Sequence, residues 1–261
     1  MTRIQEELLF PTLISLGPLT IHTYGLLVAV GFVAGLSVTI RLGKDQGIGS
    51  QQVLDMAFFM AAAGLVGSRL LYVAMKWEYF GSHPIDILMI WRGGLVFHGA
   101  VLGAILALFW YTRKRDLSFW GAGDLWAPGT ALGLAIGRIG CFMAGCCYGK
   151  PTDHPFAVVF THPESLAPLN VPIHPTQLYA SALSVTIFVI LTFIHRKKKY
   201  AGQVVLWFML LHSFARLVVE RFRGDDRGLI AATQMTPTQL TAILILVASG
   251  IILAIKSSKH K

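Results

Sequence analysis

Long apolar stretches recur along the chain, and short polar segments separate them. A lipid bilayer core about 30 Å thick is crossed by about 20 apolar helical residues, and the sequence holds about seven stretches of that kind. Their approximate limits are Leu19–Ile40, Val53–Met75, Leu95–Thr112, Phe119–Ile136, Thr176–Ile194, Val204–Val219 and Leu240–Ile255. The fourth is the weakest, because Asp124 and Pro128 interrupt it. The pattern predicts an all-α, polytopic membrane helix bundle.

Basic residues gather after every second apolar stretch. The clusters are Arg41 and Lys44, Arg113-Lys114-Arg115, Arg196-Lys197-Lys198-Lys199, and Lys256 with Lys259 and Lys261. Because such clusters mark cytoplasmic loops, the N-terminus is expected outside and the C-terminus in the cytoplasm. The alternation requires an odd number of spans, so it supports the weak fourth one. The loops Trp77–Gly93, Cys141–Pro175 and Arg221–Thr236 then face outward, and the proline-rich Cys141–Pro175 loop predicts a small ordered cap without a long helix.

Composition supports an integral membrane protein. Hydrophobic residues make up 54% of the chain and charged residues only 13%, against about 25% charged in soluble domains. The 22 Lys and Arg exceed the 13 Asp and Glu, but they lie in the loop clusters, which indicates topology and contact with membrane lipids, and not nucleic acid. Met1–Pro11 lacks the features of a removable signal peptide. We expect residues 1–261 to form a single integral-membrane domain.

Several glycines are spaced four residues apart within the predicted spans. They are Gly31 and Gly35, Gly99 and Gly103, and Gly129, Gly133 and Gly137. Such spacing allows two helix backbones to approach closely, so we interpret it as helix packing.

Charged side chains within membrane spans are costly and need a partner or a function. They are Arg69, His98, Arg138, Arg216, Glu220 and Arg223. Helical spacing of four and then three residues places Arg216, Glu220 and Arg223 on one face, where the glutamate can pair with both arginines. One interpretation is a self-contained salt-bridge cluster. Four arginines against one carboxylate leave net positive charge, however, and in the outer half of a membrane this favours a phospholipid phosphate, which guanidinium groups bind in a bidentate way.

Other candidate groups for chemistry lie beside these charges. His98 follows two glycines near the start of a span, and its near-neutral pKa suits proton transfer. Tyr24 lies near the outer end of the first span, where aromatic residues also serve as membrane anchors. The stretch Gly137–Gly149 combines Arg138, which could instead reach toward headgroups, with every cysteine of the chain: Cys141, Cys146 and Cys147.

The cysteines are interpreted as structural. Their C-x4-C-C spacing is not a standard zinc pattern, so neither a metal nor a cofactor is predicted. If a disulfide forms at the oxidising outer face, Cys141 is expected to pair with Cys146 or Cys147, because a vicinal bond would be strained.

Taken together and in order, five motifs give the sequence a resemblance to a known family. They are Tyr24-Gly25-Leu26, Gly93-Gly94-Leu95-Val96-Phe97-His98-Gly99, Gly137-Arg138-Ile139-Gly140 with Gly149, His174-Pro175-Thr176-Gln177-Leu178-Tyr179, and Arg216-Leu217-Val218-Val219-Glu220-Arg221-Phe222-Arg223. The chain resembles the bacterial prolipoprotein diacylglyceryl transferases nearly end to end. The resemblance implies transfer of the diacylglyceryl group of phosphatidylglycerol to the lipobox cysteine thiol of a preprolipoprotein signal peptide, with formation of a thioether.

The resemblance also implies roles for individual residues. Arg138 would bind the phosphatidylglycerol headgroup and, with His98 and Arg216, serve catalysis. The expected substrate-binding set further contains Tyr24, Arg69, Glu220, Arg223, Gly94 and Gly149.

The sequence departs from the family at one motif. Cys141, Ala144 and Cys146 stand where the family signature has Asn, Asn and Glu. Two alternatives therefore remain beside the transferase: a paralogous membrane protein with a thiol-linked, metal-linked or different lipid-linked role, and a transporter or lipid-binding protein without catalysis. Cys141, Cys146, Cys147, His154, His162 and His174 could supply soft ligands for the first of these.

Overall fold

The structure is a computed structural model, and it describes residues 4–5, 11–16, 19–226, 228, 230 and 234–259. Lys261, much of Met1–Pro11 and part of the Arg221–Thr236 loop, which entered the topology predictions, lie outside the described residues.

Helices occupy all seven predicted stretches. The α-helices are α1 Thr23–Lys44, α2 Ser50–Met75, α3 Trp77–Ser82, α4 Phe97–Lys114, α5 Phe119–Met143, α6 Thr176–Lys197, α7 Gln203–Glu220 and α8 Pro237–Lys259. In the described part of the chain, six helices are long and apolar enough to cross a membrane: α1, α2, α5, α6, α7 and α8. α4 has the predicted position but ends in Arg113 and Lys114, which lower its hydropathy. The prediction of an all-α, multi-pass membrane protein is confirmed.

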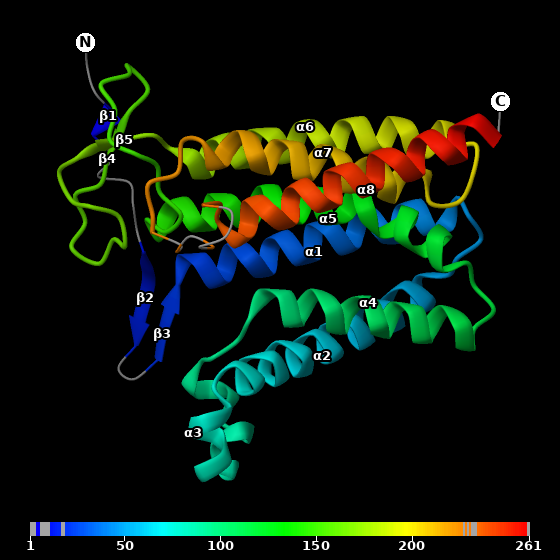
Figure 1. Cartoon of the computed structure of the whole chain (residues 1–261), viewed down its shortest axis with the longest axis horizontal. Coiled ribbons are helices and arrows are strands. Elements are labelled where there is room, and N and C mark those ends of the chain that lie inside the picture. Colours follow the sequence, from blue (N-terminus) through cyan, green and yellow to red (C-terminus); the bar gives the residue numbers. More distant parts are fainter. Residues whose placement is uncertain are drawn as a thin grey trace. The chain divides into compact units, whose positions relative to one another are not determined.

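The predicted start of the first span was wrong. Leu19–His22 forms strand β3, which pairs antiparallel with β2, Thr12–Leu16, and α1 begins only at Thr23. Figure 1 shows the two strands as a hairpin that leads directly into α1. Alternating residues Leu19-Thr20-Ile21-His22 suit a strand as well as a helix end, and pairing with β2 decides between them.

The chain divides into two compact units, which we describe separately. Unit 1 comprises residues 1–39 and 124–261, and unit 2 comprises residues 40–123. The single domain expected from the sequence stays a prediction.

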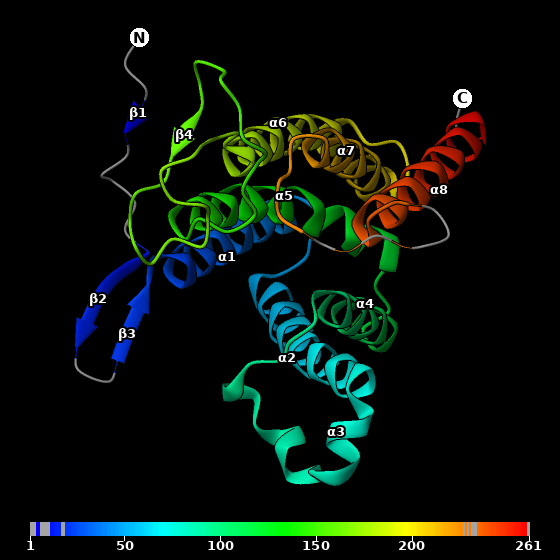
Figure 2. The same ribbon diagram turned by 60° about the vertical axis from the view of Figure 1, so that its left-hand side comes forward.

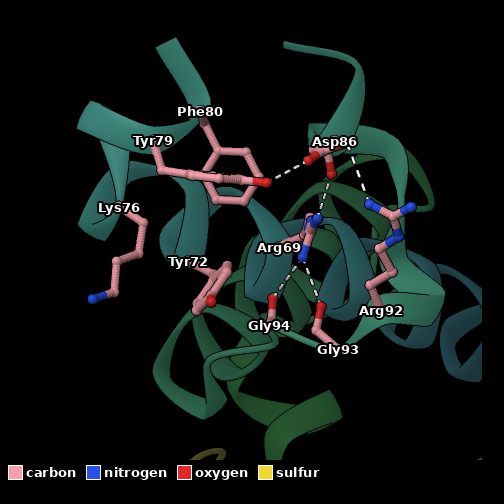
Figure 3. A pocket seen from close by; sticks show the side chains of 9 residues that line it. All are labelled: Arg69, Tyr72, Lys76, Tyr79, Phe80, Asp86, Arg92, Gly93 and Gly94. Carbon is pink, nitrogen blue, oxygen red and sulfur yellow. Dashed lines mark hydrogen bonds and ion pairs between the residues drawn. The ribbon is translucent and has the colours of Figure 1, made fainter. Parts of the chain in front are cut away.

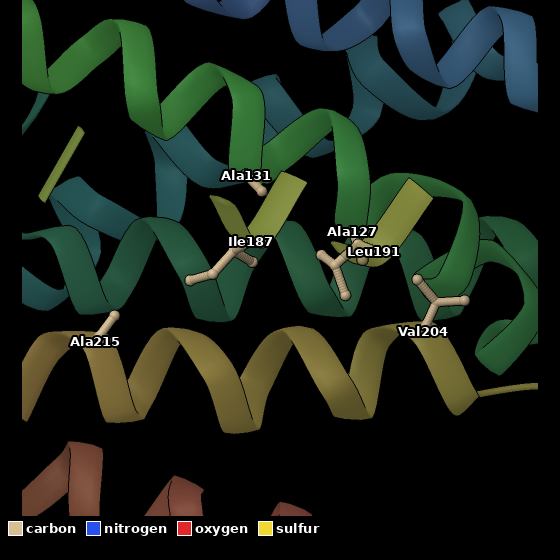
Figure 4. Close-up of a cluster of buried hydrophobic side chains, with 6 residues drawn as sticks. All are labelled: Ala127, Ala131, Ile187, Leu191, Val204 and Ala215. Carbon is tan, nitrogen blue, oxygen red and sulfur yellow. The ribbon is translucent and has the colours of Figure 1, made fainter. Parts of the chain in front are cut away.

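Unit 1 is a bundle of α1, α5, α6, α7 and α8. The predicted glycine packing is confirmed for α1 and α5, where Gly31 lies against Gly133 and Gly35 against Gly129. A Cβ on Gly137 would meet nothing within 4 Å among the described residues, so this glycine takes no part in the packing. Between α5, α6 and α7, small and branched side chains fill the interior (Figure 4): Ala127, Ala131, Ile187, Leu191, Val204 and Ala215.

Asp124, which weakened the fourth predicted span, has a structural partner far along the chain. Its carboxylate is fully buried and accepts hydrogen bonds from the backbone N–H groups of Gly202 and Val204, at 2.9 and 2.8 Å. It also accepts one from Val205 at 3.0 Å and lies 3.5 Å from Lys198 Nζ. The first N–H groups of a helix have no partner within that helix, so Asp124 of α5 caps α7 in trans.

The predicted cap is confirmed as a segment without a long helix, although α5 runs on to Met143. It contains strands β4, Val158–Val159, and β5, Pro172–Ile173, which pair antiparallel. Strand β1, Ile4–Gln5, adds to β4 in parallel (Figure 2). The cap has its own core: Phe142, Val158, Phe160, Ala167 and Ile173.

Unit 2 consists of α2 packed along α4, with α3 and two short 3-10 helices, Pro84–Leu88 and Ile90–Arg92, between them. Gly99 lies against Gly67 and Gly103 against Ala63. The predicted Gly99 and Gly103 packing is therefore confirmed.

Candidate functional site

The residues predicted for the site belong to both units. Unit 1 holds Tyr24, Arg138, Gly149, Arg216, Glu220 and Arg223, and unit 2 holds Arg69, Gly94 and His98.

Arg138 lies in the last turns of α5 and is half-buried. It interacts electrostatically with Tyr24 of α1, with Cys141 one turn further along α5, and with His212 of α7. Within the described residues, its guanidinium has no hydrogen-bond or ion-pair partner. A half-buried cation without a counter-charge is unfavourable in a low-dielectric region, so the position suits a bound anion.

Arg216 and Glu220 form the ion pair that their spacing predicted. Arg216 Nη2 lies 3.0 Å from Glu220 Oε2, both side chains are largely buried, and Glu220 Oε1 accepts a hydrogen bond from Thr236 Oγ1 at 3.0 Å. The glutamate therefore links the end of α7 to the start of α8. Its two contacts restrict the positions that the arginine can take.

The predicted pairing of Glu220 with Arg223 was wrong. α7 ends at Glu220, so Arg223 lies beyond the helix and does not continue its face. Its guanidinium donates to both carboxylate oxygens of Asp225, Nε to Oδ1 at 2.8 Å and Nη2 to Oδ2 at 2.6 Å. Burial lowers the pKa of Arg223, but the hydrogen bonds to Asp225 and Cys147 outweigh it and raise the pKa above its usual value.

Gly149 is held between two segments of backbone. Its N–H donates to the His174 carbonyl at 3.1 Å, while the N–H of Lys150 donates to the Phe222 carbonyl at 2.8 Å. A side chain on Gly149 would collide with His174 and with the Phe222 carbonyl oxygen, 2.9 Å away. The glycine therefore allows the cap to join the segment that follows α7.

His174 contributes to the same junction. One ring nitrogen lies 3.2 Å from the Tyr179 hydroxyl, and the ring packs against Phe222. Burial lowers the pKa of His174, and the charge of His154 lowers it further. As predicted from the apolar stretch Thr176–Ile194, α6 begins at Thr176.

The three cysteines lie together at the end of α5, and none of them is in a disulfide. Their Sγ atoms are all within 4.8 Å of one another. Hydrogen bonds from the Cys141 and Cys146 thiols, together with nearby Arg223, lower the pKa of Cys147, although burial opposes this.

Unit 2 contains a pocket of about 400 Å³ (Figure 3). It is lined by Arg69, Tyr72, Lys76, Tyr79, Phe80, Asp86, Arg92, Gly93 and Gly94. Three basic residues and one acidic residue line it, so the pocket has an excess of positive charge.

Arg69 at the centre of this pocket is buried and engaged. Its guanidinium donates to the carbonyl oxygens of Ile87 at 2.9 Å, Asp86 at 2.5 Å and Gly93 at 2.6 Å. It also lies over the rings of Tyr72 and Phe80. These hydrogen bonds order the loop between α3 and α4. The acceptors are backbone carbonyl groups, which carry no net charge, so they do not neutralise the positive charge of Arg69.

The same arrangement around Arg69 requires a glycine at position 94. Its φ of +72° favours glycine, and its carbonyl oxygen accepts from Arg69 Nη1 at 3.2 Å. A Cβ there would lie 2.8 Å from that nitrogen and collide with Tyr72. Glycine is thus required for the Arg69 contacts.

His98 is the second residue of α4, and its side chain is exposed. Its ring packs edge-to-face on Phe97, at a centroid distance of 6.0 Å. Across the described ranges no hydrogen-bond partner occupies its ring nitrogens. The imidazole is therefore available to exchange a proton.

Comparison with known proteins agrees with the motifs. The model of the family described as prolipoprotein diacylglyceryl transferase matches residues 11–255. The chain belongs to this family. Proteins named phosphatidylglycerol–prolipoprotein diacylglyceryl transferase are similar along most of their length. The protein from Clostridium tetani is 34% identical over 84% of this chain and 87% of its own, and that from Bordetella parapertussis is 34% identical over 96% and 97%.

Membership of the prolipoprotein diacylglyceryl transferase family confirms the resemblance and makes the chain a transferase. Another relative, from Thermosynechococcus vestitus, is 33% identical over 90% of this chain and 87% of its own. The paralogue and transporter alternatives are not favoured by these relatives.

Sequence reasoning missed His212. It lies one turn before Arg216 on α7, stacks on Phe208, and interacts electrostatically with both Arg138 and Arg216. The spacing 212, 216 and 220 places it on the helix face of Arg216 and Glu220. That regular spacing could have identified it.

Proposed function

We propose that this protein transfers the diacylglyceryl group of phosphatidylglycerol to the lipobox cysteine of preprolipoprotein signal peptides. Family membership supports the reaction class. The observation that supports phosphatidylglycerol as the substrate is Arg138, a half-buried guanidinium without a partner among the described residues. A lipid phosphate at a membrane interface supplies the counter-charge that this arginine needs.

The reaction joins a sulfur to a glycerol carbon. The acceptor thiol loses its proton, and the thiolate attacks the glycerol carbon that bears the phosphate. The carbon–oxygen bond breaks, the thioether forms, and glycerol phosphate leaves with the bonding electrons. Negative charge therefore increases on the leaving group as the bond breaks.

We assign the residues by this change in charge. Arg138 binds the headgroup phosphate, and Arg216, oriented by Glu220, stabilises the leaving phosphate. His98 takes the thiol proton, because its ring nitrogens are exposed and have no described partner. Tyr24 contacts the lipid beside Arg138.

The other predicted residues support the site through the backbone. Arg69 and Gly94 order the loop before α4, which carries His98. Arg223 and Gly149 hold the junction of the cap with the segment after α7. They are positioning residues in this proposal.

The proposed location is the bacterial plasma membrane, with the N-terminus outside and the C-terminus in the cytoplasm. Basic residues in the last turns of α1, α4, α6 and α8 support this orientation. The cap and the Arg138 end of α5 then face outward, where preprolipoproteins emerge.

The test uses the purified protein in detergent micelles, phosphatidylglycerol and a synthetic peptide with a lipobox cysteine. Mass spectrometry should detect the peptide with one added diacylglyceryl group, together with released glycerol phosphate. A peptide with serine in place of cysteine, and diacylglycerol without a headgroup phosphate, should give no product. Failure to modify the cysteine peptide under conditions in which a known relative does so would contradict the proposal.

A further inference from the structure

The thiol cluster at the end of α5 is built by the backbone around it. After Met143 the chain turns back through Gly145 and Cys147, whose φ angles of +72° and +61° are both left-handed. A side chain at Gly145 would collide with Ser165 and lie 3.0 Å from the backbone nitrogens of Leu166 and Ala167. For Cys147 this conformation is uncommon for a residue other than glycine. The turn returns Cys146 and Cys147 to the side of Cys141.

The start of α6 fixes this turn. Gln177 Nε2 donates to the Cys146 carbonyl at 2.8 Å, and Thr176 Oγ1 donates to the Cys147 carbonyl at 2.7 Å. Gln177 is nearly fully buried, and its Oε1 has no hydrogen-bond partner among the described residues. A rigid loop with an unused buried acceptor beside it is a feature of a binding site more than of a simple turn.

The sulfur separations suit a metal ion. Zinc–sulfur bonds of about 2.3 Å in a tetrahedral site place the sulfur atoms about 3.8 Å apart. The three Sγ atoms lie within 4.8 Å of one another, so small rotations of the side chains are sufficient. The C-x4-C-C spacing alone is not a standard zinc pattern, and only the left-handed turn makes these thiols converge.

We propose that Cys141, Cys146 and Cys147 bind a thiophilic d10 metal ion, with Zn²⁺ as the representative, and leave one coordination position open. Within the described residues, no His, Asp or Glu joins the three cysteines in this cluster. Structural zinc sites use four protein ligands, whereas reactive ones use three and an exchangeable fourth. Zn²⁺ with three thiolates carries a net charge of about −1, and Arg223, which interacts with Cys147, offsets it.

The ligand class for the open position is a thiol. A soft ion bound by thiolates favours a further sulfur ligand. If the proposed function holds, on which this step alone rests, the ligand is the acceptor cysteine of the peptide. The metal would lower the pKa of that thiol, His98, the proposed base, would take up its proton, and the resulting thiolate would attack the glycerol carbon.

Metal binding is tested without lipid or peptide, so its outcome does not depend on the transferase activity. The reduced protein is loaded with Zn²⁺, desalted and analysed by elemental mass spectrometry. We expect about one Zn²⁺ per chain, and less than a tenth of this in Cys141→Ser, Cys146→Ser and Cys147→Ser. His154→Gln, an exposed cap histidine outside the cluster, should bind like the parent. Equal zinc in the parent and the three serine variants, or none in the parent, would overturn the proposal.

Co²⁺ substitution provides a second measurement. Three thiolates give strong charge-transfer absorption in the near ultraviolet, and visible bands report a four-coordinate ion. Adding a cysteine peptide should shift these bands, whereas the serine peptide should not. Bands that do not respond to the cysteine peptide would overturn the open position. Circular dichroism of each serine variant identifies one that simply fails to fold, and Cd²⁺ titration of the parent protein then decides: absence of thiolate absorption overturns the site.

Discussion

The Asp124 carboxylate on α5 accepts a hydrogen bond from the Val204 N–H in the first turn of α7, although 80 residues separate the two in sequence. Asp124, which appeared to interrupt a membrane span, therefore caps the start of α7. We predict that Asp124→Ala lowers the free energy of unfolding by about 3 kcal/mol, because it leaves the first N–H groups of α7 without their buried acceptor and removes the carboxylate beside Lys198.

Reversible unfolding in mixed micelles, monitored by circular dichroism, measures this change. Asp153→Asn, at an exposed position of the cap, is the control and should have the parent's stability. A parent-like Asp124→Ala protein would mean that water satisfies the N–H groups of α7.

The contact of Gly35 with Gly129 gives a second prediction. A Cβ on Gly35 would lie 2.5 Å from the Gly129 carbonyl oxygen, so α1 and α5 must separate to accept alanine. We expect Gly35→Ala to cost about 1–3 kcal/mol in micelles. Gly25→Ala on the same helix meets nothing within 4 Å among the described residues and should be neutral or slightly stabilising. Equal effects of the two substitutions would contradict close packing as the cause.

Hydrophobic length predicted where the seven long helices lie, and glycine spacing predicted much of their packing, because both are local properties. They could not predict contacts that join distant segments. Asp124 was interpreted as an interruption because its partners come much later in the sequence, after the cap and α6. The apolar stretch Val204–Val219 predicted the end of α7 to within one residue, but helical spacing was extended past that end, so Arg223 was assigned to a helix face that does not reach it.

The candidate site shows the same limit. Charge imbalance drew attention to the arginines, but counting charges missed their neutral partners. Arg69 is held by backbone carbonyl oxygens 17 to 25 residues away, and no side-chain pattern indicates such contacts. The convergence of the thiols depends on the left-handed φ of Cys147. Residues other than glycine rarely adopt this conformation, so the sequence did not predict it.

Arg138→Lys tests whether this arginine acts by more than its charge. Lysine keeps the positive charge but loses the planar pair of donors that binds two phosphate oxygens. We expect turnover to fall by about 100- to 1000-fold, with the protein still folded by circular dichroism. Arg113→Lys, in the last turn of α4, is the control and should turn over like the parent. Near-normal turnover of Arg138→Lys would assign Arg138 to general electrostatic attraction.

Glu220→Gln tests whether the glutamate orients Arg216. Glutamine can still accept the Thr236 hydrogen bond but lacks the charge that holds Arg216, 3.0 Å away. We expect kcat to fall by roughly 10- to 100-fold with little change in KM, because the orientation of the arginine matters most in the transition state. Glu164→Gln, on the exposed cap, serves as the control. A large rise in KM with unchanged kcat would instead place Glu220 in lipid binding.

His98→Gln tests the proposed base through its pH dependence. Glutamine cannot take up a proton at neutral pH, so the variant should fold and bind lipid yet transfer slowly. A free cysteine thiol has a pKa of about 8.5, and its thiolate fraction rises as the pH approaches that value. The deficit of His98→Gln relative to the parent should therefore be greatest at about pH 7 and narrow toward about pH 9, since the acceptor then ionises without help. His83→Gln, an exposed histidine of the same unit, should follow the parent at each pH. A His98→Gln deficit that stays constant across this range would exclude proton removal as its role, because a group that only positions the substrate has no reason to become less important as the thiol ionises.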